Sequence, residues 1–199
     1  MRPLIYLPVL LATLWLSGCT AITAVSMVPG GLIEMVASEF KGKEKSLPRN
    51  IHTTLAAVQS TLKSMKLDVD ILEIQENGYA MSFGNQALDG KITLAMMTPK
   101  LTVVNVKVRR KMREASVEQA IIESLETKLA RMNSRQRFRY SGYHHLRSKP
   151  DIQTASLGWY RKNAILDTRR NGKTEWSRIK LPSGKTAYLK NSPINLAKN

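Results

Sequence analysis

The chain has 199 residues, with 31 Lys plus Arg, 15 Asp plus Glu, three His and one Cys, and its formal charge is +16. A hydrophobic share of 43% is enough for a packed core, so the composition excludes a wholly disordered chain. One Cys excludes an internal disulfide and a Cys-based zinc or iron–sulfur site. With only three His we also expect no His-built metal centre and no cofactor.

The first residues have the pattern of an export signal. One positive charge, Arg2, precedes an uncharged apolar run over residues 4–15. This run is shorter than the roughly 20 apolar residues that a membrane-spanning helix needs, and it suits the apolar region of a secretory signal. Two alternatives are an ordinary cleaved signal and an uncleaved membrane anchor. The membrane anchor is considered because apolar residues continue to Pro29.

The apolar run ends in Leu16-Ser17-Gly18-Cys19. This sequence resembles the lipobox of bacterial lipoproteins, in which an aliphatic and two small residues precede a Cys. The resemblance implies that the signal peptide, residues 1–18, is cut between Gly18 and Cys19, and that Cys19 carries fatty acyl chains such as palmitate. In that family an Asp after the Cys retains the protein at the inner membrane. Because Thr20 stands there, we expect the cell outer membrane, facing the periplasm.

The next segment, residues 19–49, is predicted to be a lipidated N-terminus and tether. Pro29-Gly30-Gly31 interrupts any helix, and a polar stretch precedes Pro48. Apolar residues recur within 32–40. They fit either a short amphipathic turn on the membrane or the first packing element of the following domain.

A regular pattern over residues 50–132 predicts an α+β domain. Asn50 can cap a helix whose apolar residues recur at helical spacing: Ile51, Leu55, Val58, Leu62 and Met65. Alternating apolar residues then predict four strands, with a shift of phase at Leu72 and a hairpin at Asn77-Gly78. A closing helix is predicted from Ser116, with Gln119 completing a capping box.

These elements predict a helix, a four-stranded antiparallel meander and a second helix. The two helices are expected to cover one face of the sheet. The pattern over residues 50–132 resembles a family of small bacterial lipoproteins of uncharacterised function. That resemblance implies no activity.

The C-terminal third contains motifs of another kind. His145-Leu146-Arg147-Ser148-Lys149-Pro150 resembles the Asn-Val-Arg-Ser-Gly-Pro signature of bacterial SH3-like domains. Glu175-Trp176-Ser177-Arg178-Ile179-Lys180-Leu181 and Pro182-Ser183-Gly184-Lys185-Thr186-Ala187-Tyr188-Leu189 resemble a later strand and hairpin of that family. The resemblance implies a small all-β SH3-like barrel over residues 136–196, so the expected fold class is α+β followed by this barrel.

Members of that family often bind cell-wall peptide stems or protein partners in a groove lined by aromatic side chains. The matching positions here are Tyr143, Trp159, Tyr160, Trp176 and Tyr188. Arg147, Lys180 and Lys185 are the cations expected to meet ligand carboxylates. A barrel this small also needs aromatics in its core, so Trp159, Trp176 and Tyr188 are expected first of all to pack in the core or at its edge.

Two basic runs complete the pattern: Lys107, Arg109, Arg110, Lys111 and Arg113, and then Arg135, Arg137 and Arg139 among aromatic residues. In a cytoplasmic protein they would indicate nucleic-acid binding. An exported chain meets no nucleic acid, so the expected ligands are anionic polymers of the cell envelope. The alternative is a solvated basic surface with no specific partner.

No catalytic motif is recognised, and the carboxylates are scattered, so an enzyme is not expected. The sequence therefore predicts a lipid-anchored outer-membrane lipoprotein that acts as a non-catalytic binding or scaffold module for peptidoglycan or a protein partner. The alternative is a structural subunit of an envelope-spanning secretion or transfer machine.

Overall fold

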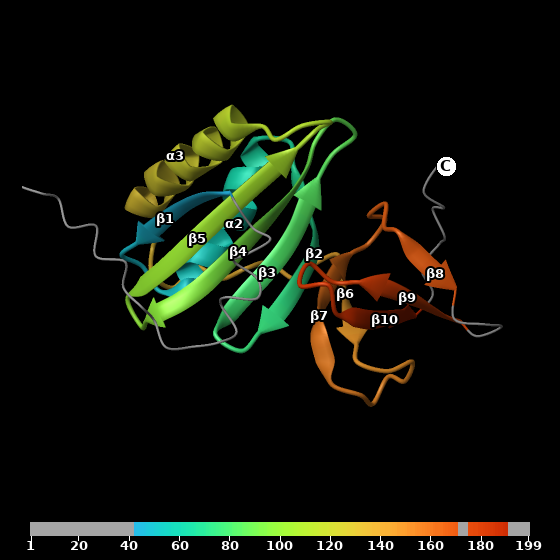
Figure 1. Cartoon of the computed structure of the whole chain (residues 1–199). Helices are drawn as coiled ribbons and strands as arrows, with labels where there is room; N and C mark the ends of the chain where they lie inside the picture. Colours follow the sequence, from blue (N-terminus) through green and yellow to red (C-terminus); the bar gives the residue numbers. More distant parts are fainter. Residues whose placement is uncertain (1–41, 171–174, 191–199) are drawn as a thin grey trace, which may run out of the picture.

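The computed structural model describes residues 42–170 and 175–190, so the signal sequence, Cys19 and most of the predicted tether lie outside the described residues. The described chain forms one antiparallel sheet of ten strands in the order β1-β5-β4-β3-β2-β7-β6-β10-β9-β8. Figure 1 shows strands β1 to β5 beside two helices, with the C-terminal strands grouped beyond β2. The elements, in chain order, are β1 (Lys43–Leu47), α2 (Ile51–Ser64), β2 (Asp68–Gln75), β3 (Gly78–Gly84), β4 (Asp89–Thr98), β5 (Leu101–Arg109), α3 (Ala115–Arg131), β6 (Tyr143–Arg147), β7 (Ser156–Arg161), β8 (Thr168–Arg170), β9 (Trp176–Lys180) and β10 (Thr186–Lys190).

A first hydrophobic core lies between the helices and β1 to β5. It joins the apolar residues of α2 to those of α3 and to alternate residues of the strands, including Leu55, Phe83, Ile92, Val106 and Leu125. Asn50 caps α2 as predicted, because its side-chain oxygen accepts a hydrogen bond from the backbone N–H of Thr53 at 2.9 Å. No helix in the described part of the chain is long and apolar enough to cross a membrane.

Strand β2 belongs to two cores at once. A bulge between Val69 and Ile71 changes which residues face the helices. Val69 and Leu72 consequently pack in the first core, whereas Ile71 packs in a second core. The second core is completed by residues of the C-terminal strands and their connections, among them Leu146, Tyr160, Leu166, Ile179 and Leu189.

The predicted fold class is wrong. Strand β7 pairs with β2, with Ile71 opposite Tyr160 and Leu72 opposite Trp159, so the C-terminal strands continue the first sheet instead of closing a separate barrel. Strand β1, which lies within the predicted tether, adds a further strand by pairing with β5. The result is a ten-stranded sheet with two described helices, not a four-stranded domain followed by an SH3-like barrel.

Two local predictions also need correction. Helix α3 begins at Ala115 with Glu114 as its N-cap residue, and no side chain caps it. The capping box is therefore absent, and Gln119 donates to Glu123 at 2.6 Å instead. The predicted hairpin forms, but its turn is Glu76-Asn77, and Gly78 is already paired with Gln75.

Candidate functional site

The predicted ligand-binding residues do not form one groove. Tyr143 and Trp159 pack against the first core, and the Tyr143 hydroxyl donates to the carbonyl oxygen of Val69 at 2.9 Å. Tyr160 is buried in the second core. The ring of Trp159 contacts that of Tyr140 in a tilted arrangement, with ring centroids 4.5 Å apart. Tyr143, Trp159 and Tyr160 therefore pack where the two parts of the sheet meet, and the side chains of Trp159 and Tyr160 lie on opposite faces of β7.

The remaining five predicted residues lie farther along the sheet. Trp176 and Lys180 are on β9, Tyr188 is on β10 and Arg147 ends β6. Trp176 and Tyr188 are half-buried and Lys180 is exposed. Lys185 is exposed in the turn between β9 and β10. Four of the eight residues therefore come from three neighbouring strands.

The register aligns cations across these strands. Arg147 pairs with Tyr188, Tyr188 with Arg178, and Arg178 with Arg169 of β8. Directly paired residues point to the same side of a sheet. We call Arg147, Tyr188, Arg178 and Arg169 the arginine row; it lies on the face opposite to Leu146, Ile179 and Leu189 of the second core.

The arginine row has few charge partners. Arg147 donates to the carbonyl oxygen of Thr154 at 2.8 Å, whereas Arg169 and Arg178 are exposed. Within residues 42–170 and 175–190, no carboxylate forms an ion pair with any of the three arginines. The row thus presents the guanidinium groups of Arg169 and Arg178 to solvent beside the half-buried Arg147 and Tyr188, a combination that suits carboxylate or phosphate ligands.

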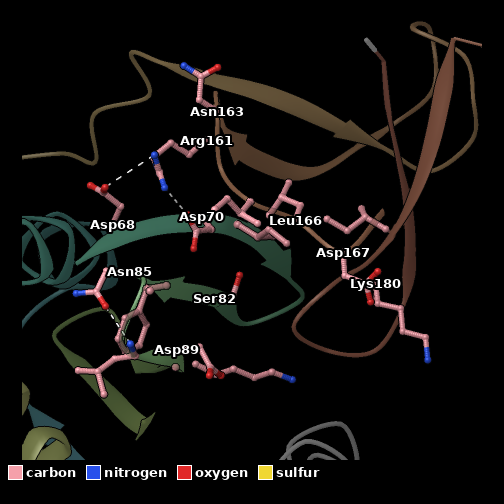
Figure 2. Close-up of a pocket in the computed structure, with 18 of the residues that line it drawn as sticks. Asp68, Asp70, Ser82, Asn85, Asp89, Arg161, Asn163, Leu166, Asp167 and Lys180 are labelled. Carbon is pink, nitrogen blue, oxygen red and sulfur yellow. Dashed lines mark hydrogen bonds and ion pairs between the residues drawn. The ribbon is translucent and has the colours of Figure 1, made fainter. Parts of the chain in front are cut away.

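A cleft of about 890 Å³ lies between β2, β3 and β4 on one side and the C-terminal strands on the other (Figure 2). The charged residues of the first wall are Asp68, Asp70, Asp89 and Lys91, and those of the second are Asp167, Arg169, Arg178 and Lys180. The cleft therefore borders the arginine row. Its volume falls within the range of small-molecule sites, about 300–1,000 Å³.

At the edge of this cleft, one guanidinium group forms ion pairs with two carboxylates. The guanidinium of Arg161 of β7 lies 2.7 Å from the carboxylate of Asp70 and 3.8 Å from that of Asp68. Figure 2 marks both contacts with dashed lines. Burial raises the pKa of the Asp70 carboxyl above its usual value, and the nearby charge of Asp68 acts in the same direction; the hydrogen bond and the charge of Arg161 oppose this only in part. The Nε of Arg161 is buried and has no hydrogen-bond partner among the described residues.

The first basic run is mostly engaged within the fold. Arg109 pairs with Asp89 at 3.2 Å, and Arg113 with the buried Glu118 at 2.6 Å. Glu118 also accepts a hydrogen bond from the backbone N–H of Val108 at 3.1 Å. Burial opposes the ionisation of Glu118, but the hydrogen bonds from Arg113 and Val108 and the nearby positive charges outweigh it and lower the pKa of this carboxyl.

The second basic run is not a strand. Its segment lies along α2, where the backbone N–H of Arg139 donates to Gln59 at 2.8 Å and Phe138 is buried in the first core. Arg135, Arg137 and Arg139 are exposed. Phe138, the aromatic residue between them, is part of the core, and the exposed Tyr140 that follows contacts the rings of Phe138 and Trp159, so this run does not alternate cations with free aromatic rings.

The two adjacent histidines do not converge on one ligand. His144 contacts the ring of Tyr160 and His145 that of Trp159, on opposite faces of β6 and β7. Across the described ranges there is no group of three or more His, Cys, Asp or Glu side chains that could hold a metal ion.

Sequence reasoning missed Arg169, Arg178 and the carboxylates of the cleft. Arg178 lies inside one of the motifs used for the SH3-like resemblance, but its partners in the row depend on strand pairings that no local pattern specifies. Asp70 occupies the bulge of β2, and only the change of apolar phase after it was a usable signal.

No protein-family model matches the chain, and a search of curated proteins finds no significant relative.

Proposed function

We propose that this chain is a lipid-anchored protein of the bacterial envelope that binds anionic groups of the cell wall without catalysing a reaction. The lipobox-like sequence Leu16-Ser17-Gly18-Cys19 supports the anchor, and the arginine row supports the binding. Acyl chains on Cys19 would hold one end at the outer membrane, with the described domain in the periplasm.

The arginine row is the observation on which the binding proposal depends. Arg178 and Arg169 stand on adjacent strands, about 5 Å apart as paired strands are, and Arg147 stands about two strand spacings from Arg178, with Tyr188 of β10 between them. The stem peptides of peptidoglycan carry carboxylates at repeated positions. Forked guanidinium groups on a rigid sheet can donate two hydrogen bonds to each carboxylate, and Tyr188 between them supplies an apolar surface for the peptide.

Binding of this kind is weak for each contact and gains strength from repetition. A polymer with many carboxylates can engage several protein molecules held on the same membrane, so effective concentration replaces high affinity at one site. Exposed charge contacts are also screened by salt, so retention on the wall should fall as ionic strength rises.

The test is retention of the whole chain, purified in mild detergent, on isolated peptidoglycan sacculi. The variant Arg147→Gln/Arg178→Gln removes two charges from the row. The matched control Arg110→Gln/Lys111→Gln removes two exposed charges from the loop before α3. We expect the row variant to lose at least about tenfold in retention, which corresponds to one charge-assisted contact, and the control to keep it.

Equal losses in both variants would show that net charge alone determines retention, and would contradict a role for the row. Absence of retention of the unmodified chain at low and moderate salt would end the wall-binding proposal. A stoichiometric protein partner recovered in its place would favour a structural subunit of an envelope machine.

A further inference from the structure

Aromatic side chains form a strip on the face of the sheet that carries the arginine row. The ring centroid of Trp159 lies 4.5 Å from that of Tyr140 and 5.8 Å from that of His145. Tyr79 of β3 lies at the other end, where its ring contacts His52 in the first turn of α2. We call Tyr79, Tyr140, Trp159 and His145 the aromatic strip.

Strand pairing places the strip on one face of the sheet. His145 of β6 stands opposite Trp159 of β7, and Trp159 stands opposite Leu72 of β2. Leu72 also stands opposite Met81 of β3, which is two residues from Tyr79 along the strand. Paired residues, and residues two apart in one strand, point to the same side of a sheet. The strip therefore crosses the neighbouring strands β3, β2, β7 and β6 (Figure 1).

The strip reaches solvent, although its rings also pack on the first core. Tyr140 is 40% exposed, and Ile74, which stands opposite Tyr79 on β2, is 42% exposed. His145 is exposed, and Tyr79 and Trp159 are half-buried. Burial raises the pKa of the Tyr140 phenol and the nearby Tyr79 acts in the same direction, so the two phenols lie near each other. Contiguous apolar side chains at a surface are typical of a binding site.

A hydrogen-bonding group of defined polarity completes the strip. The hydroxyl of Ser156 lies 3.0 Å from Nδ1 of His145 and donates its proton to the carbonyl oxygen of Gly158 at 3.2 Å. With that proton used, Nδ1 of His145 is the donor to Ser156. In the neutral ring Nε2 is then an acceptor, on a residue that is exposed. The strip thus combines ring surface with an acceptor for a hydroxyl or amide proton.

A sugar ring matches both properties, because its C–H face packs on aromatic rings while its hydroxyl groups form hydrogen bonds at the rim. We propose that the aromatic strip binds the glycan strand of peptidoglycan. Sugar rings would pack against Trp159 and Tyr140, and a hydroxyl or amide group would donate to Nε2 of His145. Ile74, beside Tyr79, offers an apolar contact for the methyl group of an acetamido substituent.

The neighbouring arginine row favours this glycan over others. His145 and Arg147 are two residues apart on β6, so the strip and the row form one continuous surface. Peptidoglycan carries N-acetylated sugars and carboxylate-bearing peptides on the same polymer. The strip would bind the sugars and the row the peptides, so the inference rests on the wall binding proposed above.

The experiment is calorimetric titration of the whole chain, in a detergent without sugar headgroups, with an uncharged tetramer of N-acetylglucosamine. Because this probe carries no carboxylate, it tests the strip without the row. We expect Tyr140→Ala/His145→Ala to weaken binding at least about tenfold, since the double variant removes a ring contact and a hydrogen bond. Arg147→Gln/Arg178→Gln should leave binding unchanged, and so should added salt.

The adjacent histidine provides a matched control. His144 is also exposed but lies on the other face, where its ring contacts that of Tyr160. His145→Ala alone should weaken binding of the tetramer at least about threefold, the effect of one hydrogen bond, and His144→Ala should not. Since Tyr140 contacts Phe138 of the first core, His145→Ala provides the decision if Tyr140→Ala lowers the melting temperature.

Retention on sacculi separates this inference from the wall binding on which it rests, and we expect the double variant to be retained less than the unmodified chain. If the double variant is retained equally, or if the tetramer does not bind at about 10 mM, the glycan inference is overturned while wall binding by the row stands. Binding of the tetramer without any retention on sacculi would overturn peptidoglycan as the ligand.

Two further outcomes would contradict the strip as a sugar site. Equal losses in His144→Ala and His145→Ala would show that the face of β6 does not matter. Absence of sugar binding, together with a change from dimer to monomer in the double variant, would make the strip a contact between two copies of the chain.

Discussion

The two parts of the sheet are stabilised in different ways. The part from β1 to β5 has two helices over its core, and its buried Glu118 is satisfied by Val108 and Arg113 within the same part. The C-terminal part has no helix among its described residues, and it depends on β2 for an apolar residue, Ile71, and a buried carboxylate, Glu73. The C-terminal strands are therefore an extension of the first part and depend on it for stability.

The largest effect is expected at Gly158, where β7 passes closest to β2. A Cβ at this position would lie 2.0 Å from the carbonyl oxygen of Leu72, and the backbone φ of +151° is unfavourable for other residues. Gly158→Ala should therefore separate β7 from β2 and lower the free energy of unfolding by at least about 3 kcal/mol. Urea unfolding measures the loss, and amide hydrogen exchange should show it first in the C-terminal strands.

Gly142→Ala is the matched control. Its φ is +83°, but no atom lies within 4 Å of the added Cβ, so the expected loss is only about 1 kcal/mol. If the two variants unfold at the same urea concentration, the close contact between β2 and β7 does not support the C-terminal part.

The next effect concerns the tip of the β9–β10 hairpin. Ser183 donates to the buried carboxylate of Glu73 through its hydroxyl at 2.5 Å and its backbone N–H at 2.9 Å. Ser183→Ala removes one donor from a carboxylate that is 2% exposed, and should cost about 2 kcal/mol. Thermal unfolding measures this loss of stability, and Ser141→Ala, which changes an exposed serine, is the control.

Combining Ser183→Ala with Glu73→Gln sharpens that result. The two residues are in direct contact, so their effects should not add, with a coupling of about 1 kcal/mol or more. Strict additivity would mean that the hairpin tip does not use this carboxylate.

The first part offers a pH-dependent comparison at Glu118. Its pKa is lowered in the folded chain, so its contribution to stability is complete above the ordinary value of 4.5 and is lost as the pH falls through the folded pKa. Glu118→Gln should therefore cost about 1–2 kcal/mol at pH 7, and the difference from the unmodified chain should shrink below about pH 4.5. Urea unfolding over pH 3–7 gives both values; a difference that grows on acidification would reverse the assigned sign.

The smallest effect is expected in the exposed loop before α3. Arg110 and Lys111 are exposed, and their side chains form no hydrogen bond or ion pair with the described residues, in contrast to Arg109 and Arg113. Arg110→Gln/Lys111→Gln should change the free energy of unfolding by no more than about 0.5 kcal/mol. A larger loss in urea unfolding would show that this loop contributes to the first core.

The sequence predicted the first part of the molecule well at the level of single elements. Helix α2, the bulge in β2 and the strands around Met81, Ile92 and Val106 follow from apolar spacing and an N-cap, which are local signals. The start of α3 was placed one residue late because Ser116 and Gln119 match a capping box that the structure does not form.

The fold class and the candidate sites could not be predicted in this way. The pairing of β2 with β7 joins residues about 90 positions apart, and the contact between Glu73 and Ser183 spans 110. Local motifs resembling an SH3-like domain were present, but they contain no information about which strand lies next to β7. The arginine row and the cleft both depend on that pairing, so neither was visible as a unit in the sequence.

The central claim, attachment to the envelope through Cys19, is tested most directly by labelling bacteria that express the chain with radioactive palmitate. We predict that the unmodified chain is labelled and sediments with the outer membrane, and that Cys19→Ser is unlabelled and released from it. An unmodified chain that takes up no label, keeps Met1 and is recovered from the cytosol would contradict the account, and would make nucleic acid the expected ligand of its cations.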